Sequence, residues 1–128
     1  MTDTAEYVAD AAKVAEQNDA FRKNVCLGIP YGPDDPVLRG QVVTTRAVHT
    51  KGMPFVQASL AAIGGLTDFP ADNDPDGFHD FGAVEVDGTT VWVKIDLYDD
   101  ANMAWGSEAP DDPARTYRLM TILFPSDW

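Results

Sequence analysis

The spacing of hydrophobic residues along the chain changes several times, and each spacing predicts a different element. Between Tyr7 and Val25, apolar residues recur at every third or fourth position, which predicts one face of a helix, although Asn18 interrupts the stripe. The segment 52–65 has a similar spacing, with Pro54 in its first turn and two glycines at its end, and predicts a second helix.

Runs of β-branched and aromatic residues predict the strands. Asp87 and Gly88 separate two such runs by the two residues that favour a type I′ hairpin turn. The segment 115–124 is apolar on both faces, so we expect it to be a central strand of the sheet. Strands are predicted at 40–49, 80–86, 89–98 and 115–124.

The order of these elements predicts an α+β domain, with two helices packed on one face of a mostly antiparallel sheet of about four strands. At 128 residues the chain has the length of one domain, 1–128. Its single cysteine, Cys26, excludes an internal disulfide and favours a cytoplasmic location. The N-terminus lacks the apolar core of a signal peptide, and no apolar run could span a bilayer, so we expect no membrane partner.

The acidic residues are concentrated in one part of the chain. Residues 66–112 contain 13 Asp and Glu but only one basic residue, Lys94, whereas the remaining 8 acidic and 8 basic residues cancel. The whole net charge of −12 therefore arises in this segment. Such a field repels nucleic acid and anionic membranes and attracts cations or basic protein surfaces, although it also serves solubility.

The densest acidic stretch, ADNDPDGFHDFG at residues 71–82, has the spacing of part of a calcium loop. Positions 1, 3, 5, 6 and 9 of an EF-hand would be Asp72, Asp74, Asp76, Gly77 and Asp80. Position 12 is Ala83 where a bidentate Glu is required, and a strand follows instead of a helix, so the stretch is not an EF-hand. A different calcium site and a solvated turn, in which the carboxylates cap the backbone, are both open.

A loose match to the PD-(D/E)xK nuclease pattern also occurs, with Pro75 and Asp76 followed later by Lys94. That chemistry needs a carboxylate two residues before the lysine to hold magnesium, but this position is Trp92. Because the acidic field would also repel DNA, the sequence argues against a nuclease, and we expect neither a bound metal nor another cofactor.

The predicted hairpin brings several reactive side chains to one face of the sheet. Counting outwards from the two-residue turn places Phe81 opposite Lys94 and His79 opposite Asp96, and alternation adds Tyr98 to the same face. In an enzyme or ligand-binding protein, His79 would be the base, Asp96 would orient it and Lys94 would hold an anionic group. The alternative is an open sheet face covered by cross-strand ion pairs.

Five segments resemble a small uncharacterised family found on alphaproteobacterial chromosomes, plasmids and phages: EQNDAFRKN, GQVVTTRAV, FPADNDPDGFHDFGAVEVDG, WVKIDLYD and GSEAPDDPARTYRLMTILF. That family's motifs read NDAFR, TRGV, NDPxGEHDFG, KIDYYD and TRVLTIM, and the resemblance covers residues 16–124. It implies membership of a group without an assigned activity. Phe78 stands here where the family has Glu, and Ala47 where it has Gly, and the loss of an acid beside His79 weakens a metal site there.

These features lead to two hypotheses about function. The first is a non-enzymatic acidic binding protein, which could act as a DNA mimic encoded by a mobile element and inhibit a CRISPR, restriction or other nucleic-acid-binding complex of its host. Its partner would be a basic protein surface and not nucleic acid. The second is an enzyme, small-ligand binder or metal binder that uses His79, Lys94, Asp96 and Tyr98. In the first hypothesis, that of an acidic binding protein, nine acidic residues would form the contact surface: Asp68, Asp72, Asp74, Asp76, Asp99, Asp100, Glu108, Asp111 and Asp112.

Overall fold

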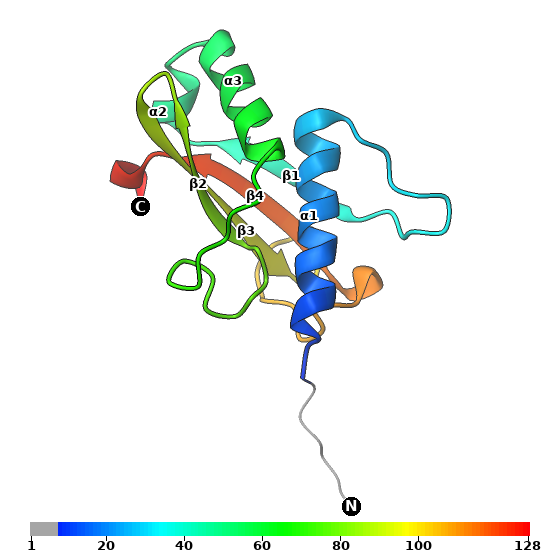
Figure 1. Cartoon of the computed structure of the whole chain (residues 1–128). Coiled ribbons are helices and arrows are strands. Elements are labelled where there is room, and N and C mark those ends of the chain that lie inside the picture. The colour runs from blue at the N-terminus through cyan, green and yellow to red at the C-terminus, as the bar shows by residue number, and fades with distance from the viewer. Residues whose placement is uncertain (1–7) are drawn as a thin grey trace, which may run out of the picture.

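A computed structural model describes residues 8–128 of the chain (Figure 1). Tyr7, the first residue of the predicted apolar stripe, lies outside the described residues. The elements are, in chain order, α1 (Ala11–Leu27), β1 (Arg39–Thr44), α2 (Arg46–His49), α3 (Met53–Gly64), β2 (Phe81–Val86), β3 (Thr89–Tyr98), the 3-10 turn η1 (Pro113–Arg115), β4 (Tyr117–Leu123) and the 3-10 turn η2 (Pro125–Asp127).

The two long helices occupy the segments in which the sequence predicts them. At the start of α1, the Asp10 carboxylate accepts a hydrogen bond from the Lys13 N–H, and at its end Gly28 has a φ of 70°, which a glycine adopts without steric cost. Helix α3 has a proline in its first turn, as the sequence predicts. No helix within residues 8–128 is long and apolar enough to cross a membrane.

The sheet differs from the prediction in two respects. Its order is β1-β4-β3-β2, and β1 pairs with β4 in parallel, so the sheet is mixed and the expectation of a mostly antiparallel sheet was wrong. The described residues also form three α-helices and not two, because the segment predicted as a strand over 40–49 ends at Thr44. There the Thr45 hydroxyl accepts a hydrogen bond from the Val48 N–H and starts α2.

The predicted hairpin register is confirmed from Phe81 to Val86. Phe81 pairs with Lys94, and Val86 pairs with Thr89 across the turn. Residues Asp87 and Gly88 of the turn have φ values of 51° and 77°, the left-handed pair that a type I′ turn requires. Strand β4 lies between β1 and β3, which confirms that this apolar strand is in the interior of the sheet.

The hydrophobic core lies between the helices and one face of the sheet. Figure 1 shows α1 and α3 side by side over the strands, and α3 also contacts β2. The buried core side chains come from both layers: Phe21, Leu38, Val48, Phe55, Ile63, Leu66, Val86, Val91, Val93, Ile95, Met120 and Ile122. On the opposite face of β3, the side chains of Trp92, Lys94, Asp96 and Tyr98 are only partly buried. The protein is therefore a two-layer domain with one open sheet face.

Helix α1 can approach β1 closely because residue 40 is a glycine. A Cβ atom added to Gly40 would lie 2.7 Å from the ring of Phe21 and even closer to the backbone oxygen of Arg118. We therefore expect Gly40→Ala to lower the free energy of unfolding by about 1–3 kcal/mol, measured by chemical denaturation. Gly65→Ala is the control, because its Cβ would come no nearer than 3.7 Å to another residue. Equal losses in the two variants would contradict this account of the contact.

Candidate functional site

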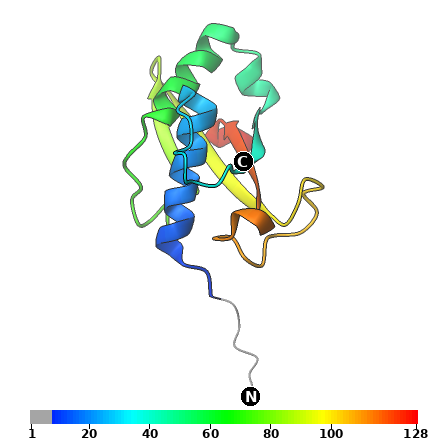
Figure 2. The ribbon, with the colours of Figure 1, turned by 90° about the vertical axis from the view of Figure 1, so that its right-hand side faces the viewer.

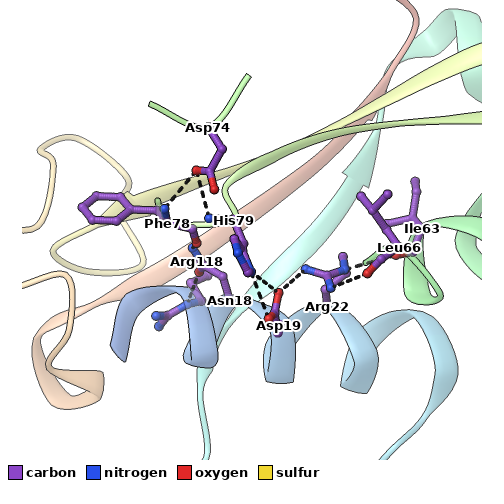
Figure 3. A network of polar contacts seen from close by, with 9 residues as sticks. All are labelled: Asn18, Asp19, Arg22, Ile63, Leu66, Asp74, Phe78, His79 and Arg118. Carbon is purple, nitrogen blue, oxygen red and sulfur yellow. Dashed lines mark hydrogen bonds and ion pairs between the residues drawn. The ribbon is translucent and has the colours of Figure 1, made fainter. Parts of the chain in front are cut away.

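A network of charged side chains connects α1 with the loop before β2 (Figure 3). Its centre is the carboxylate of Asp19, which accepts a hydrogen bond from Nη1 of Arg22 at 2.9 Å. The same carboxylate lies 3.0 Å from Nδ1 of His79, in the loop 60 residues away along the chain. Asp19 therefore performs the orienting role that the sequence assigned to Asp96.

Arg22 is buried, with an exposed fraction of only 2%. Its remaining donors reach backbone oxygens at the end of α3, with Nε 3.1 Å from Ile63 O and Nη2 3.0 Å from Leu66 O. Phe69 contacts both partners of Asp19, because its ring lies 5.0 Å from the Arg22 guanidinium and stacks 4.1 Å from the His79 imidazole. The imidazole thus has a fixed plane as well as a fixed hydrogen bond.

The backbone of His79 is held in an unusual conformation. Its φ is 54°, a left-handed value that costs of order 1 kcal/mol or more for a non-glycine residue unless its surroundings enforce it. The buried Asp74 carboxylate accepts hydrogen bonds from the N–H groups of Phe78 and His79, at 2.9 and 3.1 Å. On the other side, the Asn18 side chain donates to Phe78 O at 2.9 Å. The turn at His79 is therefore held by one contact from α1 and by two contacts from within its own loop.

His79 borders a cavity of about 630 Å³ that lies between α1, the loop after α1 and the loop before β2. Among residues 8–128, no protein group hydrogen-bonds the other imidazole nitrogen, Nε2. With its proton held on Nδ1 by Asp19, a neutral His79 can accept a hydrogen bond at Nε2. The lining combines apolar and charged groups: Ala12, Ala15, Glu16, Asp19, Ala20, Lys23, Ile29, Pro30, Tyr31, Gly32, Asp35, Gly77 and His79.

A second buried arginine, Arg118 on β4, lies beneath α1. Its Nε donates to Asn18 Oδ1 and its Nη2 donates to Gln17 Oε1, both at 2.9 Å. No carboxylate hydrogen-bonds it, and among the described residues Nη1 has no partner. Burial lowers the pKa of Arg118 to about 10, while the nearby Tyr31 acts in the opposite direction. Burial raises the pKa of Tyr31, and the charge of Arg118 partly offsets this increase.

Burial also raises the pKa values of two other groups, Cys26 and Asp80. Burial raises the pKa of Cys26 to about 11, although Arg22 lowers it slightly, so the thiol stays protonated and is not an activated nucleophile. Burial raises the pKa of Asp80, a backbone hydrogen bond partly offsets this, and the nearby Asp74, Asp76 and Asp96 raise the pKa further. Within residues 8–128, no three His, Cys, Asp or Glu side chains are close enough to hold a metal ion.

The nine acidic residues predicted to form one contact surface divide into three groups. Asp74 and Asp111 are buried, at 7% and 9% exposure, and are used internally: Asp74 caps the His79 turn and Asp111 accepts a hydrogen bond from the Asp10 N–H. The other seven are exposed or partly exposed, in loops 66–80 and 99–112: Asp68, Asp72, Asp76, Asp99, Asp100, Glu108 and Asp112. Figure 2 shows these loops on opposite sides of α1, so the carboxylates form two patches.

The alternative site is also divided. Lys94 and Asp96 form an ion pair of 3.3 Å and, with Tyr98, border a hollow of about 400 Å³ on the open sheet face. His79 does not join them, so its predicted position opposite Asp96 was wrong. The ladder continues only to Asp80, whose backbone oxygen accepts from the Ile95 N–H at 2.8 Å. The left-handed conformation of His79 then turns the chain towards α1.

Residues 44–127 match the family described as a protein of unknown function (DUF3768), and the chain belongs to that family. No curated protein and no solved structure matches the chain. The matched residues include Asp74, His79 and the whole of β2, β3 and β4. Asp19, Arg22 and most of β1 precede them.

The α1 part of the network was not predicted from the sequence, although one signal was present. Asn18 interrupts the apolar stripe, and Arg22 follows it by four residues on the same face. Two polar side chains on the buried face of a helix require buried partners, and here those partners are backbone oxygens and Arg118. The pattern indicated a buried polar site, but not which loop would complete it.

The different roles of two neighbouring aspartates can be tested directly. Asp74→Ala removes the acceptor of two partly buried N–H groups, so we expect it to lower the free energy of unfolding by about 1–3 kcal/mol. Asp76→Ala removes an exposed carboxylate without an ion pair to any described residue, so its effect should be below about 0.5 kcal/mol. Urea denaturation of both variants would check this, and a larger loss in Asp76→Ala would refute the assignment.

Proposed function

We propose that this protein is a non-enzymatic binding protein that presents its acidic loops to a basic protein surface. One observation carries the proposal. The seven exposed or partly exposed carboxylates of loops 66–80 and 99–112 form no ion pair with any described residue. The one lysine in that part of the chain, Lys94, is already paired with Asp96. The charge of these loops is thus available to an external partner.

The partner best suited to such loops is a protein that binds nucleic acid. Its binding surface is basic and is arranged to receive phosphates, and carboxylates held on ordered loops can occupy the same positions. Both loops have fixed ends, since Asp74 caps the first and the Tyr98–Gly106 bridge closes part of the second. The resemblance to proteins of plasmids and phages supports a host defence complex, such as a CRISPR or restriction system, as the target of a DNA-mimic inhibitor.

Affinity capture tests this function. The tagged protein is incubated with a lysate of the cells that carry its gene, at about 50 mM and about 500 mM NaCl, and bound proteins are identified by mass spectrometry. We expect a nucleic-acid-binding protein that is retained at low salt and released at high salt, because the attraction is screened. DNA should compete with the captured protein for binding.

Matched charge variants separate a specific contact from a general effect of charge. The loop variant carries Asp72→Asn, Asp76→Asn, Asp99→Asn and Asp100→Asn. The control carries Glu16→Gln, Asp34→Asn, Glu85→Gln and Asp87→Asn, four exposed acids outside the two loops, and has the same net charge. Capture should fall at least tenfold in the loop variant only. Equal capture by both variants would show that the loops are not the contact surface.

A second candidate function rests on the cavity beside His79. A histidine with one nitrogen fixed by Asp19, and with no described hydrogen-bond partner for Nε2, is suited to bind a small polar ligand. Tyr31 and Lys23 line the same cavity and could contact an aromatic or anionic part of that ligand. Lys94, Asp96 and Tyr98 take no part in this version of the site.

Ligand screening by NMR tests the second candidate. A small molecule that binds in the cavity should shift the ring resonances of His79 and Tyr31, and His79→Asn should abolish binding because Asn tolerates the left-handed backbone but lacks the imidazole. His49→Asn is the control, since His49 is the other histidine of the chain and is exposed. A ligand that binds equally well to both variants would not use this site.

A further inference from the structure

We propose that the hollow on the open face of the sheet binds an uncharged heteroaromatic ring that carries an amino group, such as the base of a nucleoside. Both long helices cover the other face of the sheet (Figure 1), and this hollow of about 400 Å³ lies on the face that they leave open. It shares no residue with the cavity beside His79 or with the acidic loops 66–80 and 99–112. A ligand in the hollow is thus separate from both functions proposed above.

The floor of the hollow is formed by two antiparallel strands in a fixed register. Lys94 of β3 pairs with Thr121 of β4, and Asp96 pairs with Leu119. Alternation along β3 puts Lys94, Asp96 and Tyr98 on one face, with about 7 Å between one residue and the next. The floor is therefore about 13 Å long, which accommodates one ring system with a small substituent but not a folded partner.

An aromatic ring stands at one end of this floor. Trp128 has an exposed fraction of 75%, yet its ring is packed edge-to-face against Phe81 at 6.3 Å and against Trp92 at 6.1 Å. The ammonium of Lys94 lies over the Trp128 ring, 5.5 Å from its centroid, so one face of the ring is turned towards the hollow. That face is available for stacking, and every nucleic-acid base has a π-face that stacks on an aromatic side chain.

The position of Trp128 is fixed by the turn that precedes it. The Asp127 carboxylate accepts a hydrogen bond from the Thr45 hydroxyl at 2.7 Å and another from the Phe124 N–H at 2.9 Å. Tyr98 lines the hollow at the other end of the floor and adds a second ring. The hollow therefore has aromatic boundaries that are in place before a ligand binds, and a few polar groups lie between them.

Those polar groups match the edge of an amino-substituted ring. Asp96 binds Lys94 through Oδ2 at 3.3 Å, and its second oxygen, Oδ1, can accept a hydrogen bond from an exocyclic amino group. The Lys94 ammonium and the Thr121 hydroxyl can donate to a ring nitrogen or a carbonyl oxygen. An acceptor next to two donors is the pattern that such a base requires of its binding site.

The charges of the hollow disfavour an anionic ligand. Its lining contains two carboxylates, Asp96 and Asp127, against one ammonium, Lys94. The net charge of the whole chain is −12, so a phosphate group would be repelled both locally and at longer range. Proteins that stack the bases of a nucleic-acid strand use a basic groove for its backbone, and this face has none. The ligand is therefore a base or nucleoside and not a nucleotide.

An NMR titration of the purified chain with adenosine tests the proposal. We expect the indole N–H signal of Trp128 to shift, with a dissociation constant of about 0.1–1 mM, because an open hollow buries only part of the ligand. Inosine, which has a carbonyl oxygen in place of the amino group, and AMP should each bind about threefold more weakly or worse. Methyl glucoside, an uncharged ring without a π-face, should not bind.

Three results would overturn the proposal: no shift with adenosine up to about 5 mM, inosine or AMP binding as tightly as adenosine, or methyl glucoside binding as tightly as adenosine. Because these titrations use only the purified chain and another part of its surface, they do not depend on the capture experiment.

Matched variants locate the binding. Trp128→Ala should weaken adenosine binding about tenfold, whereas Trp105→Ala, which removes a ring of the same 75% exposure outside the hollow, should leave it unchanged. Asp96→Asn should reduce the preference for adenosine over inosine, and Asp99→Asn is the control with the same charge change. Circular dichroism checks that each variant is folded. Equal losses in the two tryptophan variants, or an unchanged preference in Asp96→Asn, would refute this site.

Discussion

The arrangement of the two layers depends on the buried guanidinium of Arg22. It donates to two backbone oxygens at the end of α3 and to Asp19, and Asp19 in turn holds His79. One side chain thus sets the position of α1 against α3 and of the acidic loop against both. Burying a cation of this kind is costly unless it is paired and hydrogen-bonded, so the three segments that supply its partners have to be positioned together.

What could be predicted from the sequence was local along the chain. The hairpin register followed from two turn residues, and the interior position of β4 followed from its apolar residues on both faces. The partner of β1 could not be predicted in this way, because periodicity identifies a strand but not its neighbour or its direction. The partner of His79 was missed for a similar reason: the hairpin ladder was predicted to include His79, but it ends one residue earlier, at Asp80, because His79 is left-handed.

The roles of the individual acidic residues could not be predicted from the sequence either. Composition and spacing identified loops rich in aspartate, but they could not separate carboxylates that serve the fold from those left for solvent. Asp74 and Asp76 have the same chemistry and are two residues apart, yet Asp74 is buried and caps two N–H groups of the turn, whereas Asp76 is exposed. The difference arises from the turn itself, whose backbone N–H groups point to one side.

The parallel pairing of β1 with β4 has a consequence for how the chain folds during synthesis. Strand β4 lies in the middle of the sheet, although it is the last of the four strands to be translated. Until it emerges from the ribosome, β1 has no strand to pair with, and the β2–β3 hairpin has an unpaired edge along β3. The core therefore forms in one late, cooperative step that unites sequence positions nearly 80 residues apart. A nascent chain stopped before Tyr117 would expose apolar strand edges and depend on chaperones.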